Sequence, residues 1–250
     1  MPGKRNRSSE WTWKSPVKKC HLDDDDEEFV GSSKAINVVG NHIYFNSLVT
    51  DESIGEMINA INNKNFEFRM IQSHELVGKM EPAPLYLHIN TDGGSLFPAM
   101  SAVDTIKKSK LPIFTVVDGR ASSAGSVIAM SGHKRFMTRH SYVMIHQLRT
   151  GVIGTYSNIS EEYINSTQFM EDLITLYAEH TRLSPKTLRK LLKKDIFWNQ
   201  ETCLHYGLVD EPWEDHDPAN PYNENNENNE KMDLSELLIE HIYKDQSESD

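Results

Sequence analysis

The sequence predicts an α/β domain, because short apolar runs alternate along it with segments of helical periodicity. A chain of 250 residues is long enough to bury one sizeable core. The short runs are apolar at nearly every position, which is typical of strands buried on both faces of a sheet. We therefore expect the folded core to span residues 35–213, between polar tails at 1–34 and 214–250.

Both predicted tails are rich in charge and poor in apolar residues. The N-terminal arm includes an acidic run at 23–28, and residues 214–250 hold 12 Asp and Glu against 2 Lys, a balance of −10 within a formal net charge of −11. Such compositions favour disorder. Trp11 and Trp13 leave a docking role open for the arm, and the apolar spacing in 234–243 leaves open a short helix that is either solvated or binds a partner.

Composition also argues against several classes of protein. The core between the tails is close to neutral and has no long basic stripe, so nothing supports nucleic-acid binding. No apolar run approaches the roughly 18 residues needed to cross a bilayer, and the N-terminus lacks an apolar signal segment. Cys20 and Cys203 show neither a disulfide framework nor metal-ligand spacing. We expect a soluble, cytoplasmic protein without metal or organic cofactor.

Several short apolar runs predict strands. In chain order they are 36–39, 42–45, 85–89, 113–117 and 142–145. Gly40 and Asn41 between the first two runs favour a hairpin or a kinked strand. The run at 85–89 leads into a glycine-containing turn at 90–95, where Gly93 and Gly94 can adopt positive φ or bring backbone N–H groups close to a ligand.

Other segments place their apolar residues on one helical face. In chain order they are 53–62, 99–106, 127–130, 157 to about 180, and 184–192. Asp51 or Ser53 is expected to cap the first helix, and Ser157 or Asn158 the long one. Ser184 precedes a proline and is expected to open the last helix.

Residues 119–126 join a predicted buried strand to a predicted buried helix and place Ser123 at the junction. Free N–H groups and the positive end of the helix dipole favour negative charge there. The small residues Ala121, Ala124 and Gly125 allow a substrate backbone to approach closely. This arrangement suits a nucleophile whose attack creates an oxyanion, and the same residues are as typical of an ordinary helix N-cap with small packing residues.

Other features lie at the ends of predicted core elements: Gly94 after one strand, His146 at the end of another, and Asp195 after a helix. A serine hydroxyl needs a histidine to take its proton, and the histidine needs an acid to fix its tautomer. The N–H groups of Gly94 and Ala124 are candidates for an oxyanion hole. Taken alone, Gly94 would be part of an ordinary turn, His146 a packing residue and Asp195 a surface carboxylate. The hypothesis of a serine hydrolase therefore rests on their joint arrangement.

These residues resemble the Clp protease proteolytic subunit (ClpP), a family of serine peptidases with a crotonase-like fold. The resemblance covers roughly residues 38–213 and rests on motifs at 87–95, 119–125, 134–136, 143–147 and 195–210. It implies that Ser123 is the nucleophile, His146 the general base and Asp195 the third member of a triad, with Gly94 and Ala124 as the oxyanion-hole amides.

The resemblance further implies hydrolysis of polypeptide substrates through an acyl-enzyme in a ring-shaped homo-oligomer. The helix at 157–180 would then lie between rings, and an AAA+ unfoldase is a candidate partner. The sequence departs from the family in places. Asp92 and Leu148 replace prolines, residues 63–84 look like an insertion, and Lys193 and Lys194 replace an acidic residue and Arg that take part in pairing two rings, so the number of rings is left open.

Two other functions stay open at this point. The chain could be a catalytically silent or weakly active ring subunit with an assembly or regulatory role, which the intact Ser123, His146 and Asp195 argue against. It could also be an acyl-CoA enzyme on the same fold. That alternative lacks the acidic pair needed for hydratase work.

Overall fold

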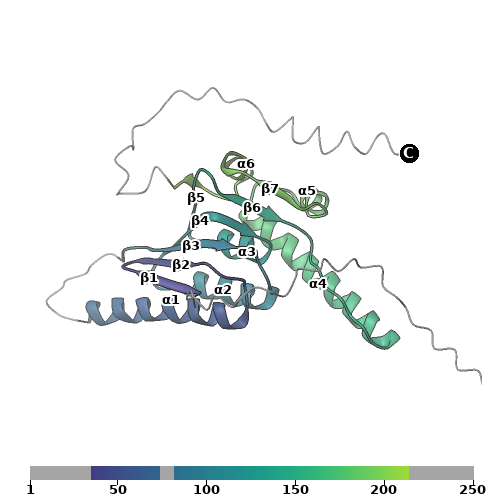
Figure 1. The fold of residues 1–250 in the computed structure, drawn as a ribbon, viewed down its shortest axis with the longest axis horizontal. Helices are drawn as coiled ribbons and strands as arrows, with labels where there is room; N and C mark the ends of the chain where they lie inside the picture. Colours follow the sequence, from purple (N-terminus) through teal and green to yellow (C-terminus); the bar gives the residue numbers. More distant parts are fainter. Residues whose placement is uncertain (1–34, 74–81, 214–250) are drawn as a thin grey trace, which may run out of the picture. The chain divides into compact units, whose positions relative to one another are not determined.

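Strands and helices alternate in the computed structural model, which describes residues 35–73 and 82–213, as the α/β prediction requires (Figure 1). In chain order the elements are β1 (Ile36–Val39), β2 (His42–Phe45), α1 (Asp51–Gln72), β3 (Leu85–Thr91), α2 (Leu96–Lys108), β4 (Ile113–Ser122), α3 (Ala124–Met130), β5 (Lys134–Met137), β6 (Tyr142–Ile145), α4 (Tyr156–His180), α5 (Pro185–Leu191), β7 (Ile196–Trp198), α6 (Gln200–Tyr206) and β8 (Glu211–Pro212). The expectations for the tails, including Trp11, Trp13, Cys20 and the helix at 234–243, lie outside the described residues.

The strands form one sheet whose main path runs β1-β2-β3-β4-β5-β8. β1 and β2 pair antiparallel through the turn at Gly40 and Asn41, where Gly40 has φ +58, so the hairpin alternative is confirmed. β2, β3, β4, β5 and β8 follow one another in parallel. The helices between them supply the crossovers that parallel strands need.

β4 is the longest described strand, and besides β3 it pairs with two further strands, one after the other along its length. Residues 114–117 pair with β5, and residues 120–122 pair with β6. β6 in turn pairs antiparallel with β7. The sheet therefore forks at the C-terminal end of β4, and this fork positions the candidate active site.

Helices α1, α2 and α3 lie against one face of the sheet (Figure 1) and share its apolar core. Ile43, Leu87 and Ile113 are fully buried on that face. The opposite face carries half-buried rings that pack on one another, stacked or edge to face: His42, Tyr44, Tyr86, Phe114 and Trp213. His88 and Val116 are buried on this face as well. The expectation that the strands are buried on both faces therefore holds at these two positions and only in part for the residues around them, where aromatic rings rather than a helix layer cover the sheet.

The helix caps differ from two of the predicted ones. Thr50 caps α1 and exchanges hydrogen bonds with Ser53, which stands three residues into the helix. Thr155 caps α4 in the same way, with Asn158 as its reciprocal partner. In each case the sequence prediction chose a residue inside the helix, because both members of a capping box are good cap formers. The predicted cap of α5, Ser184, is confirmed.

α1 continues ten residues beyond the predicted helix at 53–62 and so includes the first part of the segment 63–84 that resembles an insertion, a part for which no helix was predicted. Hydrogen bonds of the Asn65 side chain, rather than a continuous apolar face, connect this C-terminal part of α1 to the core. Asn65, 7% exposed, donates to the carbonyl of Ile61 and accepts from the N–H groups of Lys110 and Leu111. Hydrophobic periodicity cannot detect a helix held in this way.

The elements β5, β7, β8 and α6 were not predicted as such. The strands among them are at most four residues long, too short for a two-residue alternation to stand out. Among the described residues, no helix combines the length and the apolar character needed to cross a membrane.

Candidate active site

The strand register at the fork of the sheet brings three of the predicted site residues together. β4 and β6 pair in parallel with Ser122 opposite Met144, and Ser123 continues from there, donating its N–H to the Met144 carbonyl over 2.8 Å. β6 and β7 pair antiparallel with Ile145 opposite Ile196. His146 and Asp195 are therefore the next facing residues beyond the last pair of that ladder.

Ser123 has a backbone conformation that serine rarely adopts. Its φ of +52 is the only positive value among the described residues other than glycine, and its ψ is −122. These angles match the first central position of a type II′ turn, which favours glycine. A conformation of this kind costs on the order of 1–3 kcal/mol and persists only where the surroundings enforce it.

Hydrogen bonds on both sides of Ser123 enforce this conformation. Its N–H is held by the Met144 carbonyl, and its own carbonyl accepts from the N–H of Ser126 at 2.9 Å and from the Ser126 hydroxyl at 2.6 Å. The Ser126 hydroxyl also contacts the phenol of Tyr177 on α4 at 2.8 Å. Burial raises the pKa of the Tyr177 phenol, so it stays protonated and can donate.

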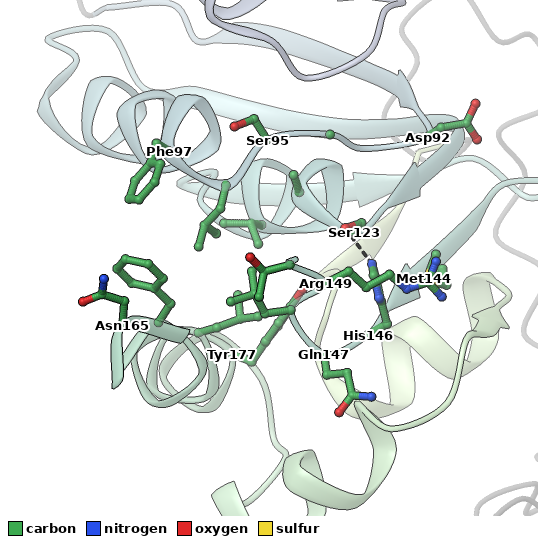
Figure 2. A pocket seen from close by; sticks show the side chains of 18 of the residues that line it. Asp92, Ser95, Phe97, Ser123, Met144, His146, Gln147, Arg149, Asn165 and Tyr177 are labelled. Carbon is green, nitrogen blue, oxygen red and sulfur yellow. Dashed lines mark hydrogen bonds between the residues drawn. The ribbon is translucent and has the colours of Figure 1, made fainter. Parts of the chain in front are cut away.

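The imidazole of His146 points at Ser123, and its Nε2 lies 2.7 Å from the serine Oγ (Figure 2). The His146 side chain is 9% exposed. Burial lowers its pKa, the positive charge of Arg149 lowers it further, and the negative charge of Asp195 opposes both effects. His146 is therefore neutral at pH 7, as an acceptor of the serine proton must be.

The neighbouring serine has a different environment. Ser122 is 2% exposed, and its hydroxyl is buried without a hydrogen-bond partner among the described residues. Ser122 and Ser123 are adjacent in sequence, yet only the Ser123 hydroxyl shares a hydrogen bond with His146. The geometry thus separates the two candidates that the motif leaves side by side.

Asp195 lies near His146 but is not hydrogen-bonded to it. Its Oδ1 is 3.8 Å from the imidazole Nδ1, which is beyond hydrogen-bond distance. The Nδ1 atom is buried and has no partner in the described part of the chain. The other carboxylate oxygen, Oδ2, accepts from the guanidinium of Arg149. The structure brings Ser123, His146 and Asp195 together, but the hydrogen bond between His146 and Asp195 is not formed.

The two predicted oxyanion-hole residues flank Ser123. Ala124 is the first residue of α3, where an N–H group has no partner within the helix. The loop with Gly93 and Gly94 lies so close to the neighbouring backbone that neither position has room for a Cβ atom. A Cβ on Gly93 would lie 2.5 Å from the Ser122 carbonyl oxygen, and one on Gly94 would lie 2.3 Å from the Val49 carbonyl oxygen. Gly94 and Ala124 line the same cavity as the serine.

This cavity has a volume of about 720 Å³ and extends from Ser123 between α2 and α4 (Figure 2). Its apolar lining comprises Leu96, Phe97, Val127, Met144, Leu148, Phe169 and Leu173. Phe97 and Phe169 meet edge to face, with their ring centroids 5.4 Å apart. The cavity can therefore hold an apolar side chain next to the serine.

The sequence analysis missed three residues that shape this site: Ser126, Tyr177 and Arg149. Tyr177 was assigned only to the apolar face of the long helix, and Ser126 only to the junction motif. The position of Arg149 could have indicated its role, because a cation three residues after the predicted base can contact the acid that pairs with that base. No group of three or more His, Cys, Asp or Glu side chains suited to a metal ion occurs within residues 35–73 and 82–213.

Comparison with known proteins finds similarity to the Clp protease family and to proteolytic subunits from bacteria. The family model described as Clp protease matches residues 44–215. The ATP-dependent Clp protease proteolytic subunit of Deinococcus radiodurans is 31% identical over 129 residues, which are 51% of this chain and 63% of that protein. The subunits of the same name from Streptococcus equi subsp. equi and Streptococcus pyogenes are 35% and 34% identical, over 54% and 53% of this chain and 71% and 70% of theirs.

Proposed function

The chain belongs to the Clp protease family, and from that premise we propose that it is a serine endopeptidase acting through an acyl-enzyme. The observation that carries the proposal is the 2.7 Å contact between His146 Nε2 and the Oγ of Ser123, at a strained junction of strand and helix. A serine hydroxyl becomes a good nucleophile when a neutral histidine accepts its proton.

In the proposed reaction, Ser123 Oγ attacks the carbonyl carbon of the scissile peptide while its proton passes to His146 Nε2. The carbonyl oxygen becomes an oxyanion that the N–H groups of Gly94 and Ala124 stabilise. The C–N bond then breaks, the proton on His146 goes to the leaving amine, and an ester to Ser123 remains. A water molecule gives a proton to His146 and attacks the ester, which releases the acid and restores the serine.

Asp195 has the third role in this proposal. By accepting a hydrogen bond from His146 Nδ1, it would keep the proton of the neutral imidazole on Nδ1 and stabilise the imidazolium. Its Oδ1 must come about 1 Å closer than the observed 3.8 Å to do so. We expect the proposed substrates to be polypeptides with an apolar side chain beside the scissile bond, because the cavity next to Ser123 has an apolar lining.

We also propose that the chain is a subunit of a homo-oligomeric ring that works with an ATP-dependent partner, of which an AAA+ unfoldase is the candidate. The relatives are named as proteolytic subunits of an ATP-dependent protease. The exposed apolar residues on the N-terminal half of α4, including Tyr163 and Ile164, support association with further copies. A cytoplasmic location is part of this proposal, and the free, buried thiol of Cys203 is compatible with it.

The proposal is tested by labelling with a serine-directed fluorophosphonate and mapping the adduct by mass spectrometry. We expect modification of Ser123 in the native sequence and in Ser122→Ala, and none in Ser123→Ala. Labelling that disappears with Ser122→Ala would assign the wrong serine. Cleavage of a fluorogenic peptide with an apolar residue before the reporter, compared with a CoA thioester, separates peptidase from acyl-CoA chemistry.

One observation favours the second candidate function, a silent or weakly active ring subunit. The hydrogen bond between His146 and Asp195 is absent, and the imidazole Nδ1 has no partner among the described residues. Folded, oligomeric protein that is neither labelled at Ser123 nor active on peptides would support that function and reject the peptidase.

A further inference from the structure

Arg149 competes with His146 for Asp195. We propose that Arg149 is a positioning residue that restrains the active site, because its guanidinium holds the Asp195 carboxylate out of hydrogen-bond distance from His146. This inference rests on the proposed peptidase function and adds a residue that sets its rate.

The first support is that the two oxygens of the Asp195 carboxylate face different groups, the guanidinium of Arg149 and the imidazole of His146. Oδ2 accepts from Arg149 Nη2, while Oδ1 faces His146 Nδ1 at 3.8 Å. A charge-assisted bond to a carboxylate is about twice as strong as a neutral one, and the neutral imidazole offers only a neutral donor. The carboxylate is therefore held nearer to Arg149.

The second support is the unsatisfied Nδ1 atom of His146. Buried polar atoms nearly always have a partner, and one without a partner marks either an incomplete site or a cost in stability. Here Asp195 is the candidate partner, and a shift of about 1 Å would complete the bond. The imidazole of His146 is 9% exposed and already bound to Ser123 Oγ, whereas the Asp195 side chain is 49% exposed, so we expect the carboxylate to make this shift.

The chemical consequence concerns both the tautomer and the basicity of His146. Without an acceptor at Nδ1, nothing keeps the proton of the neutral imidazole on Nδ1, and a proton on Nε2 cannot accept one from Ser123. The charge of Arg149 also lies close enough to oppose protonation of His146. Both effects slow the removal of the serine proton.

The strength of the restraint is limited by its exposure. The Arg149 side chain is 69% exposed and that of Asp195 is 49% exposed, so the pair resembles surface ion pairs. Its loss is expected to change the rate about two- to fivefold. A restraint of this size allows Asp195 to reach His146 during turnover.

The test replaces Arg149 by Met, which keeps the aliphatic stem and removes the guanidinium. At about pH 8, where His146 is neutral, we expect Arg149→Met to raise the fluorophosphonate labelling rate of Ser123 and the peptidase kcat about two- to fivefold. The pH midpoint of the rate should also rise. The matched control is Arg189→Met, which removes a half-exposed guanidinium that pairs with Glu171, a residue outside the cavity lining. It should leave both rates unchanged.

A double-mutant cycle shows whether Arg149 acts through Asp195. In an Asp195→Asn background, Arg149→Met should lose most of its gain in labelling rate and kcat and keep only the part that comes from removing the Arg149 charge near His146. A gain as large as in the wild-type background would overturn the inference, since Arg149 would then act through its own charge alone. An Arg149→Met variant with a rate equal to or below that of the wild type, with Ser123 still labelled, would also overturn it.

A crystal structure of Arg149→Met separates this inference from the proposed function. Asp195 within hydrogen-bond distance of His146 Nδ1 supports the restraint, and an unchanged distance of 3.8 Å rejects it. Ser123 could remain unlabelled in every variant while Asp195 lies within hydrogen-bond distance of His146 in Arg149→Met. The peptidase proposal would then be rejected, and the inference that Arg149 holds Asp195 away from His146 would be supported.

Discussion

At the scale of single residues, placement rather than residue type distinguishes the candidate nucleophile. Ser122 and Ser123 carry the same hydroxyl, yet one is buried without a partner and the other contacts His146 at 2.7 Å. Ser122 is the last residue of β4, whereas Ser123 has a positive φ at the turn that follows, and its side chain lines the cavity.

The pH dependence of activity belongs to this scale. His146 must be neutral to accept the serine proton, and burial together with Arg149 lowers its pKa below the ordinary value of 6.5. We expect kcat/KM to rise with pH and to reach half of its plateau below pH 6.5, because the folded site holds the neutral form down to lower pH. A pH profile of peptide hydrolysis checks this, with the stability of the protein monitored across the same range. A midpoint above 6.5 would contradict it.

The sequence predicts the nucleophile, the base and the acid as candidates because their residue types and the ends of strands are visible in it. It does not predict the partner of Asp195. Whether that carboxylate bonds to His146 or to Arg149 depends on a difference of about 1 Å in the folded chain. Residue order alone carries no information at that precision.

At the scale of elements, the register of β4, β6 and β7 builds the site, and α4 is linked to it from the other side of the cavity. Tyr177 on α4 is 1% exposed, and its phenol contacts the Ser126 hydroxyl, which donates to the Ser123 carbonyl. A displacement of α4 is therefore transmitted to the backbone of the candidate nucleophile.

Removing the Tyr177 hydroxyl tests this link. We expect Tyr177→Phe to lower kcat about two- to tenfold with little change in KM, since a single hydrogen bond contributes roughly 0.5–1.5 kcal/mol and no contact with substrate is lost. Steady-state kinetics on an apolar peptide measure the effect. Tyr44→Phe, on the aromatic face of the sheet and outside the cavity lining, is the matched control and should behave as wild type. A rise in KM at constant kcat would assign Tyr177 to substrate binding instead.

The limits of sequence reasoning at this scale come from short elements and polar anchors. β7 has three residues, so its pairing with β6 could not be predicted, and with it the position of Asp195 opposite His146. The second half of α1 depends on the side chain of Asn65. The longer elements with clear periodicity, such as β3, α2 and α4, were predicted to within a few residues at their ends.

At the scale of the whole molecule, the described domain leaves an apolar surface on the N-terminal half of α4 and the loop before it. Ile153, Tyr156, Ile159, Tyr163 and Ile164 are between 50% and 104% exposed. A surface of this kind is typical of an interface between subunits. The α/β fold was predictable from the pattern of apolar residues, whereas that pattern alone would assign this surface to the core, because apolar residues on a helix normally indicate its core face. Only the resemblance to a known family implied that the helix at 157–180 lies between rings.

The proposed assembly predicts the effect of charge on this surface. We expect the double variant Tyr163→Glu, Ile164→Glu to raise the dissociation constant of self-association at least ~10-fold, because carboxylates are costly to bury between subunits. Size-exclusion chromatography with light scattering gives the mass at several concentrations. Thr175→Glu, an exposed polar position further along α4, controls for added charge. An unchanged mass in the double variant would place the subunit interface elsewhere.

The strained backbone at Ser123 also bears on how such a protein changes under selection. A serine there keeps the chain in a conformation that glycine adopts freely, so the protein gives up stability for as long as the hydroxyl is needed. Once catalysis ceased to matter, replacement by glycine would relax the turn and be favoured for stability alone. If the peptidase proposal holds, the role of the hydroxyl accounts for a serine at a position that favours glycine.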